Sequence, residues 1–154
     1  MPNGPRLTKD QERARRAYGQ VSRVWEDYKR LPQGDAKRKA KKDCDDYEIA
    51  VKALGANILR SGLAAALAEL MRRKAIKVLE HLADSAIPGL GAETEGRNLL
   101  MKANNLPVGT YMLATRETLQ VVMWLKRAAE ALFDFTPEPG ASGSAVSEGD
   151  RHAQ

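Results

Sequence analysis

The side chains that could perform catalysis are few, and their spacing does not assemble a catalytic site. Cys44 is the only cysteine, and no histidine is placed to activate it, so a buried or inert thiol is expected. His81 and His152 lie too far apart to begin a zinc site. A general acid and base must converge in a dry pocket. The acidic residues near Cys44 instead spread around one helix, and we expect them to pair with nearby lysines: Asp43, Asp45, Asp46 and Glu48.

A glycine-rich stretch, GAETEGRN at 91–98, has the glycine spacing of a phosphate-binding P-loop. It lacks the lysine and the serine or threonine that hold phosphate and magnesium, and no predicted strand precedes it. The sequence therefore predicts no nucleotide site, no small-molecule substrate, no metal, no cofactor and no enzyme activity.

The basic residues indicate a different chemistry, which is the binding of a polyanion. The formal net charge is +5, and residues 134–154 contribute −3, so the remainder carries +8. Such an excess attracts RNA or DNA, although simple solubility accounts for it equally well. On the predicted final helix, Arg116, Gln120 and Arg127 share the side opposite the apolar residues. The two arginines lie roughly 16 Å apart at the α-helical rise, which suits different phosphates of one strand.

Two further groups have both a functional and a structural interpretation. Positive side chains crowd the start of the second predicted helix, from Lys37 to Lys42, where they oppose the helix dipole. Either this start is solvated, or a bound phosphate relieves the repulsion. Trp124 lies beside the arginines of the final helix and could stack on an unpaired base. Packing on another helix or on a partner protein is its simpler interpretation.

Apolar residues recur at helical spacing throughout, and no segment alternates over a strand length, so an all-α fold is predicted. Thr8 and Gln11 form a capping box for the first helix, which ends before Pro32. Asp35 is expected to cap the second helix, and Gly62 to end it. Helices are expected near 9–31, 35–59, 63–82 with a possible break at 72–74, 93–103 and 108–133. The apolar arc of the final helix comprises Tyr111, Thr118, Val122, Leu125, Ala129, Leu132 and Phe133.

These helices predict one compact bundle of about five to six helices. We expect a flexible N-terminus at 1–7, a helical-bundle domain at 8–135 and a disordered tail at 136–154, which is rich in proline, glycine and serine. No apolar run is long enough to cross a bilayer, and the first residues lack a signal sequence, so a cytoplasmic protein without membrane contact is expected.

Two stretches of the chain resemble a known family. The segments YMLATRETL at 111–119 and MWLKRAAEAL at 123–132 are similar to the C-terminal signature of the small helical subunit of type III-B (Cmr-type) CRISPR effector complexes. The segment ILRSGLAAALA at 58–68 resembles a second signature of that family. The resemblance covers roughly residues 8–133.

The resemblance implies a non-catalytic subunit of an antiviral ribonucleoprotein. Its implied partners are guide RNA and target RNA, the backbone and large subunits of the complex, and copies of itself in a head-to-tail stack. Base pairing reads the sequence in such effectors, while the protein holds the RNA backbone through basic residues. Basic positions within the signatures are Arg60, Arg116, Lys126 and Arg127. Further RNA-binding candidates are basic by composition only: Arg16, Lys52, Lys37, Arg38, Lys39, Lys41 and Lys42.

Two alternatives stay open. One is a helical protein–protein adapter, similar to the type III-A small subunit or another adapter, that never touches RNA directly. The other is an independent helical DNA-binding protein, for which the sequence offers no helix-turn-helix pair.

Overall fold

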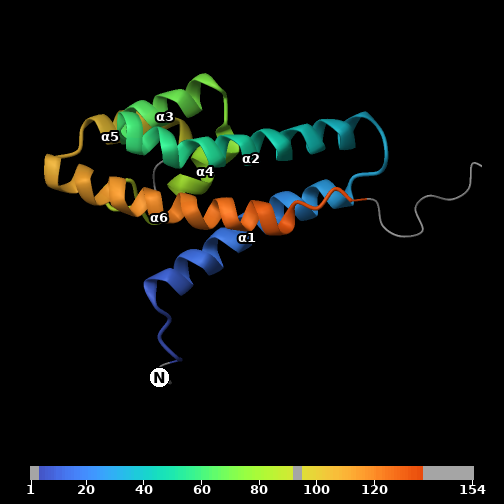
Figure 1. Ribbon diagram of the computed structural model, residues 1–154, viewed down its shortest axis with the longest axis horizontal. Helices are drawn as coiled ribbons and strands as arrows, with labels where there is room; N and C mark the ends of the chain where they lie inside the picture. The colour runs from blue at the N-terminus through green and yellow to red at the C-terminus, as the bar shows by residue number, and fades with distance from the viewer. Residues whose placement is uncertain (1–3, 92–94, 137–154) are drawn as a thin grey trace, which may run out of the picture.

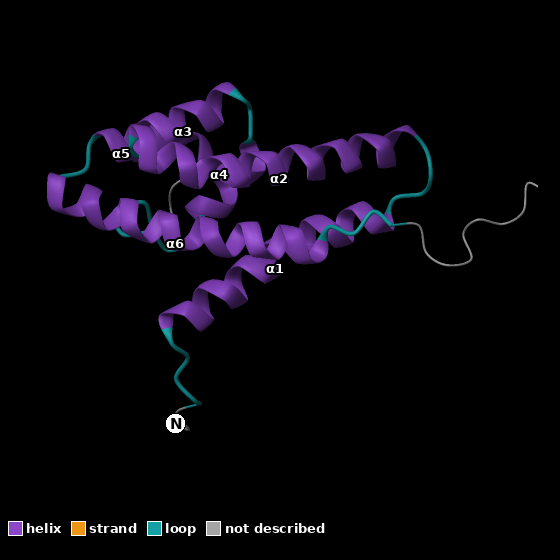
Figure 2. Ribbon diagram, in the orientation of Figure 1, coloured by secondary structure: helices purple, strands orange, loops and turns teal. Residues whose placement is uncertain are grey.

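A computed structural model describes residues 4–91 and 95–136 of the chain, and in this part the fold is all-α (Figures 1 and 2). It contains no strand there, and only an isolated bridge joins Ile87 to Leu90. The all-α prediction is therefore confirmed. The elements in chain order are α1 (Lys9–Arg30), α2 (Asp35–Ser61), α3 (Leu63–Arg72), α4 (Ile76–Ala83), the 3-10 helix η1 (Gly96–Asn98), α5 (Leu99–Asn104) and α6 (Val108–Leu132).

The ends of α1 and α2 follow local sequence signals, with one exception. The Thr8 hydroxyl accepts a hydrogen bond from the Gln11 amide at 3.2 Å, and the Gln11 side chain accepts one from the Thr8 amide at 2.8 Å. Gly62, with φ +88°, ends α2 as predicted. The prediction that Asp35 caps α2 was wrong. Gly34 occupies the cap position, and Asp35 lies in the first turn, where its carboxylate pairs with Arg38.

The predicted third helix breaks into α3 and α4 at residues 73–75. Lys74 has φ +56°, a left-handed conformation that a helix interior does not contain. The Ala75 amide bonds back to the Leu70 carbonyl at 3.0 Å and thereby closes the end of α3. The helix predicted from Glu93 to Ala103 begins at a residue outside the described ranges. Its described part consists of η1 followed by α5.

The core is shared by these helices: α6 packs against both α1 and α2, α3 packs against α2, and α4 and α5 pack against α3 (Figure 1). Of the predicted arc on α6, Thr118, Val122, Leu125 and Ala129 are buried, but Tyr111, Leu132 and Phe133 are only half-buried. The arc was misplaced because α6 has two long neighbours, which bury a second edge of small side chains. That edge consists of Ala114, Val121 and Ala128.

In residues 4–91 and 95–136, none of the helices combines the length and the hydropathy that a bilayer crossing requires. Apart from residue 136, the predicted tail at 136–154 lies outside these ranges, as do residues 1–3 of the predicted N-terminal segment, and the division of the chain into these segments stays a prediction.

Candidate nucleic-acid interface

The outward side of α6 presents a row of polar and basic side chains, which we call the α6 ridge: Arg116, Gln120, Met123 and Arg127. Successive positions are three or four residues apart, so the row follows one face of the helix, opposite the buried residues. Arg116, Gln120 and Arg127 are exposed, and Met123 is half-buried. Among the described residues, no carboxylate lies within ion-pair distance of Arg116, of Arg127 or of neighbouring Lys126. These cations are therefore available to a ligand.

Trp124 adjoins the ridge but is part of the margin of the core. Its ring is half-buried and packs against the core cluster, and its indole nitrogen is buried without a hydrogen-bond partner among the described residues. The Arg127 guanidinium carbon lies 4.9 Å from the ring centroid, a cation–π contact. This geometry favours packing over base stacking as the role of Trp124. The contact with Trp124 also orients the Arg127 side chain on the ridge.

Arg16 and Lys52, both predicted to bind RNA, connect helices of the protein itself. An Arg16 guanidinium nitrogen donates to the Ser85 carbonyl at 3.0 Å, which ties α1 to the end of α4. The Lys52 ammonium lies 3.0 Å from a Glu48 carboxylate oxygen and 3.8 Å from one of Glu130, so it joins α2 to α6. The Glu48 contact raises the Lys52 pKa. Both cations are less available to RNA than those of the α6 ridge.

The five basic residues at the start of α2, the α2 cluster, are Lys37, Arg38, Lys39, Lys41 and Lys42. Arg38 pairs with Asp35, and the Lys42 ammonium lies 3.0 Å from an Asp46 oxygen. The pairings of Asp46 and Glu48 confirm the expected contacts with nearby lysines for these two residues, whereas Asp43 and Asp45 form no ion pair within the described part of the chain. Lys37 and Lys41 lie over aromatic rings, at 5.0 Å from the Tyr28 centroid and 5.3 Å from that of Phe135. These contacts offset part of the repulsion within the cluster.

The predicted basic residues do not form one patch. Arg60 lies in the last turn of α2, whereas the α2 cluster lies in its first turns. The distance along the helix from Lys39 to Arg60 is about 32 Å at 1.5 Å per residue. The structure therefore separates the candidates into the α6 ridge with Lys126, the α2 cluster, and Arg60 at the far end of α2.

Sequence reasoning missed the role of Arg13 on α1. Its Nε and one terminal nitrogen donate to the two Glu117 oxygens at 2.8 and 2.7 Å, across α1 and α6. The hydrogen bond to Glu117 raises the Arg13 pKa and lowers that of Glu117. No sequence signal could pair these residues, since 104 positions separate them.

The groups with catalytic potential are sealed inside the bundle. Cys44 is buried, and desolvation, with smaller contributions from Asp45 and Asp43, raises its pKa to about 11. His81 is buried, and its Nδ1 lies 2.8 Å from the Tyr47 hydroxyl. Burial lowers the His81 pKa to about 4. Across the described ranges, no group of three or more potential metal ligands converges.

Comparison with known proteins identifies the family of the chain. A family model described as CRISPR-associated protein (Cas_Cmr5) matches residues 9–132. The chain belongs to the Cmr5 family. The crystal structure of a CRISPR-associated Cmr5 family protein from Thermus thermophilus has 24% sequence identity and a TM-score of 0.64, covering 83% of this chain and 100% of that one. None of the curated proteins matches the chain.

Membership of the Cmr5 family confirms the resemblance to the type III-B small subunit. The match spans α1 to α6, so the helices that carry the α6 ridge and the α2 cluster both lie inside the family region. The likeness to the Thermus protein supports the same helical fold. The chain is thus a small subunit of a type III CRISPR effector.

Proposed function

We propose that this Cmr5 protein is a non-catalytic small subunit of a type III-B ribonucleoprotein in antiviral defence. Several copies stack head to tail along the complex, and each contacts the backbone of the guide–target RNA duplex through basic residues. Arginines suit this role because a guanidinium group binds phosphate oxygens in a fixed geometry. A head-to-tail contact does not close on itself, so it permits a stack of variable length.

The single observation that carries the proposal is the α6 ridge. Arg116 and Arg127 are exposed and lack a carboxylate partner among the described residues, while other arginines of the protein, such as Arg13 and Arg72, are paired. An unpaired guanidinium can neutralise a phosphate without first breaking an internal ion pair. Because these contacts read charge and not sequence, they should weaken steeply as salt is raised.

The test replaces both arginines, as Arg116→Ala with Arg127→Ala, in an effector complex reconstituted with guide RNA and target RNA. We expect weaker target retention, and a slope of log affinity against log salt that is less steep by about one for each phosphate that the variant no longer neutralises. The matched control is Arg72→Ala with Arg73→Ala, which removes equal charge from two exposed arginines that both contact Glu69. Circular dichroism checks that every variant remains helical.

Unchanged retention and an unchanged salt slope in the ridge variant would remove the α6 ridge from the RNA interface. Equal losses of target retention in the ridge and control variants would mean that net charge, and not these two positions, causes the effect. Photocrosslinkers placed at Gln120 distinguish the adapter alternative, since crosslinks to protein subunits alone would favour a subunit that does not contact RNA.

A further inference from the structure

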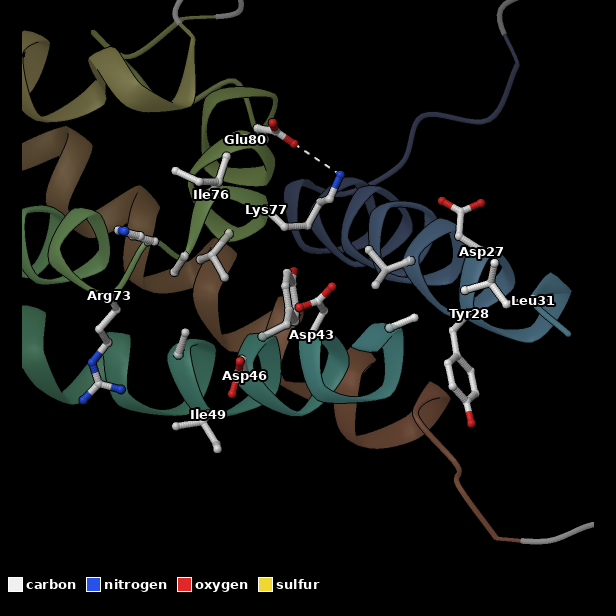
Figure 3. Close-up of a pocket in the computed structure, with 17 residues that line it drawn as sticks. Asp27, Tyr28, Leu31, Asp43, Asp46, Ile49, Arg73, Ile76, Lys77 and Glu80 are labelled. Carbon is white, nitrogen blue, oxygen red and sulfur yellow. Dashed lines mark ion pairs between the residues drawn. The ribbon is translucent and has the colours of Figure 1, made fainter. Parts of the chain in front are cut away.

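A groove of about 770 Å³ runs between the second half of α1, the first half of α2 and α4. Its apolar wall includes Val24, Leu31 and Val78. Figure 3 shows Asp43 between α2 and α4, with Tyr28 at the α1 end of the groove and its hydroxyl pointing away from α4. The groove is large enough for a planar ring and has a mixed apolar and polar lining, which is typical of small-ligand sites.

An aromatic cluster of Trp25, Tyr28 and Phe135 adjoins the α1 end of this groove. The Trp25 and Tyr28 rings stack with centroids 5.1 Å apart and an interplanar angle of 23°. Phe135, which follows α6, meets both rings edge-on, at 5.3 and 5.2 Å. Tyr28 belongs both to this cluster and to the groove lining. The cluster arises because Trp25 and Tyr28 are one turn apart on α1 and the chain after α6 returns to that turn.

Three lysines place their ammonium groups over the rings of the same cluster. Lys29, which also pairs with Glu26 at 3.0 Å, lies 5.8 Å from the Trp25 centroid, while Lys37 and Lys41 of the α2 cluster lie over Tyr28 and Phe135. A cation–π contact at an exposed site is weak, so an ammonium group can leave the ring for a phosphate at little cost. The result is a set of cations held around one aromatic surface.

Inside the groove the charged side chains are of both signs: Asp27, Asp43, Asp46, Glu80, Arg73, Lys74 and Lys77. Lys42 and Lys77 pair with Asp46 and Glu80 at 3.0 and 3.3 Å. Asp43, like Asp27 on α1, has no ion-pair partner within the described part of the chain, and Asp43 is the one that lies between α2 and α4 (Figure 3). A carboxylate accepts hydrogen bonds from an exocyclic amino group, such as that of cytosine, and cannot donate to the corresponding oxygen of uracil.

We propose that the groove and the aromatic cluster bind an unpaired nucleotide of single-stranded RNA. The base lies against Tyr28, its exocyclic amino group donates to Asp43, and its phosphate lies between Lys37 and Lys41. Paired bases hide their faces and edges inside a helix, so the site selects a nucleotide outside the duplex. The inference rests on the proposed contact with RNA but uses a surface separate from the α6 ridge.

The chain contains two tryptophans, so Trp124→Phe leaves Trp25, inside the aromatic cluster, as the only tryptophan. We expect a short cytidine oligomer to quench the Trp25 emission of this full-length variant saturably at low salt. A uridine oligomer should bind more weakly, and Asp43→Asn should abolish that preference. A second assay measures affinity with the same cytidine oligomer carrying a fluorescein label. In this assay Tyr28→Leu should weaken binding roughly tenfold, as loss of one stacking contact predicts.

Tyr18→Leu is the matched control, because Tyr18 is an exposed tyrosine of the same helix with no ring contact among the described residues. The affinity of Tyr18→Leu for the cytidine oligomer should equal that of the protein without this substitution. If Tyr28→Leu loses helicity, the pair Lys37→Gln and Lys41→Gln provides a second variant, which should bind more weakly and with a less steep salt dependence.

The proposal is overturned if the cytidine oligomer does not quench Trp25, or if an RNA duplex or heparin quenches it equally. Equal affinity losses in the Tyr18 and Tyr28 variants would overturn it as well. Arg116→Ala with Arg127→Ala should preserve the quenching. If the ridge variant retains target RNA normally in the assembled complex, the α6 ridge is rejected but the groove site is not. If the cytidine oligomer fails to quench Trp25, the groove site is rejected but the α6 ridge is not.

Discussion

The Arg13–Glu117 pair joins the beginning of α1 to the middle of α6, and removing it should measurably destabilise the fold. Both side chains are mostly covered, at 16% and 23% exposed, and two hydrogen bonds of 2.8 and 2.7 Å connect them. Glu117→Ala leaves Arg13 with only its contact to Asp10, at 2.9 Å on the surface. The substitution therefore removes the contact between the helices and spares the one within α1.

The expected magnitude follows from this geometry. A hydrogen bond between charged groups stabilises a protein by about 1.5–3 kcal/mol when covered, whereas exposed ion pairs contribute under about 1 kcal/mol. For this mostly covered bidentate pair we expect Glu117→Ala to lower the free energy of unfolding by about 2 kcal/mol. A domain of this size loses roughly 3 °C in Tm per kcal/mol, which corresponds to a decrease of about 6 °C.

A double-mutant cycle of Arg13→Ala, Glu117→Ala and both together, followed by urea unfolding at pH 7, measures the coupling directly. We expect about 1.5 kcal/mol of coupling. Because Arg13 lowers the Glu117 pKa below its ordinary 4.5, the contribution is present above that pH and is lost as the pH falls through the folded-state pKa. Arg15→Ala, at an exposed position of α1, is the control. Coupling below about 0.3 kcal/mol would refute the reasoning.

Three further outcomes follow from buried groups. Burial holds the His81 pKa at about 4, below the ordinary 6.5, so protonation favours the unfolded chain. Unfolding free energy should fall by about 2 kcal/mol from pH 7 to pH 5, and His81→Phe should flatten that slope in urea titrations. Gly96→Ala would place a Cβ 2.7 Å from the Glu80 amide nitrogen of α4, so a loss of about 2 kcal/mol or more is expected by thermal unfolding. Cys44, with a pKa of about 11, should resist a thiol reagent at pH 8 until denaturant is added, and rapid native labelling would contradict its burial.

The elements could be predicted from the sequence wherever a local signal defines them. The capping box of Thr8 and Gln11 and the positive φ of Gly62 depend on neighbouring residues only, and both were correct. Asp35 was misjudged because Gly34 takes the cap position through its own backbone, with φ +147°. The break at Lys74 was left open, since lysine carries no strong preference for its left-handed conformation.

The candidate site was predicted only where one helix carries all of it. The α6 ridge can be derived from a period of 3.6 residues, and the structure places Arg116, Gln120 and Arg127 on one exposed side as expected. Whether they bind RNA is still a prediction. The groove could not be foreseen, because its walls come from three helices, and the aromatic cluster beside it needs Phe135 to return to α1. Contacts of this kind depend on tertiary packing, which no local pattern encodes.

The turn between α1 and α2 limits the width of the groove. Only residues 31–34 separate the two helices, and both helices form walls of the groove. So short a connector limits how widely the helices can diverge at that end. Family members with a longer or shorter turn here would hold similar side chains at another spacing. Loop length, more than the identity of the lining residues, would then decide how bulky an occupant each homologue admits.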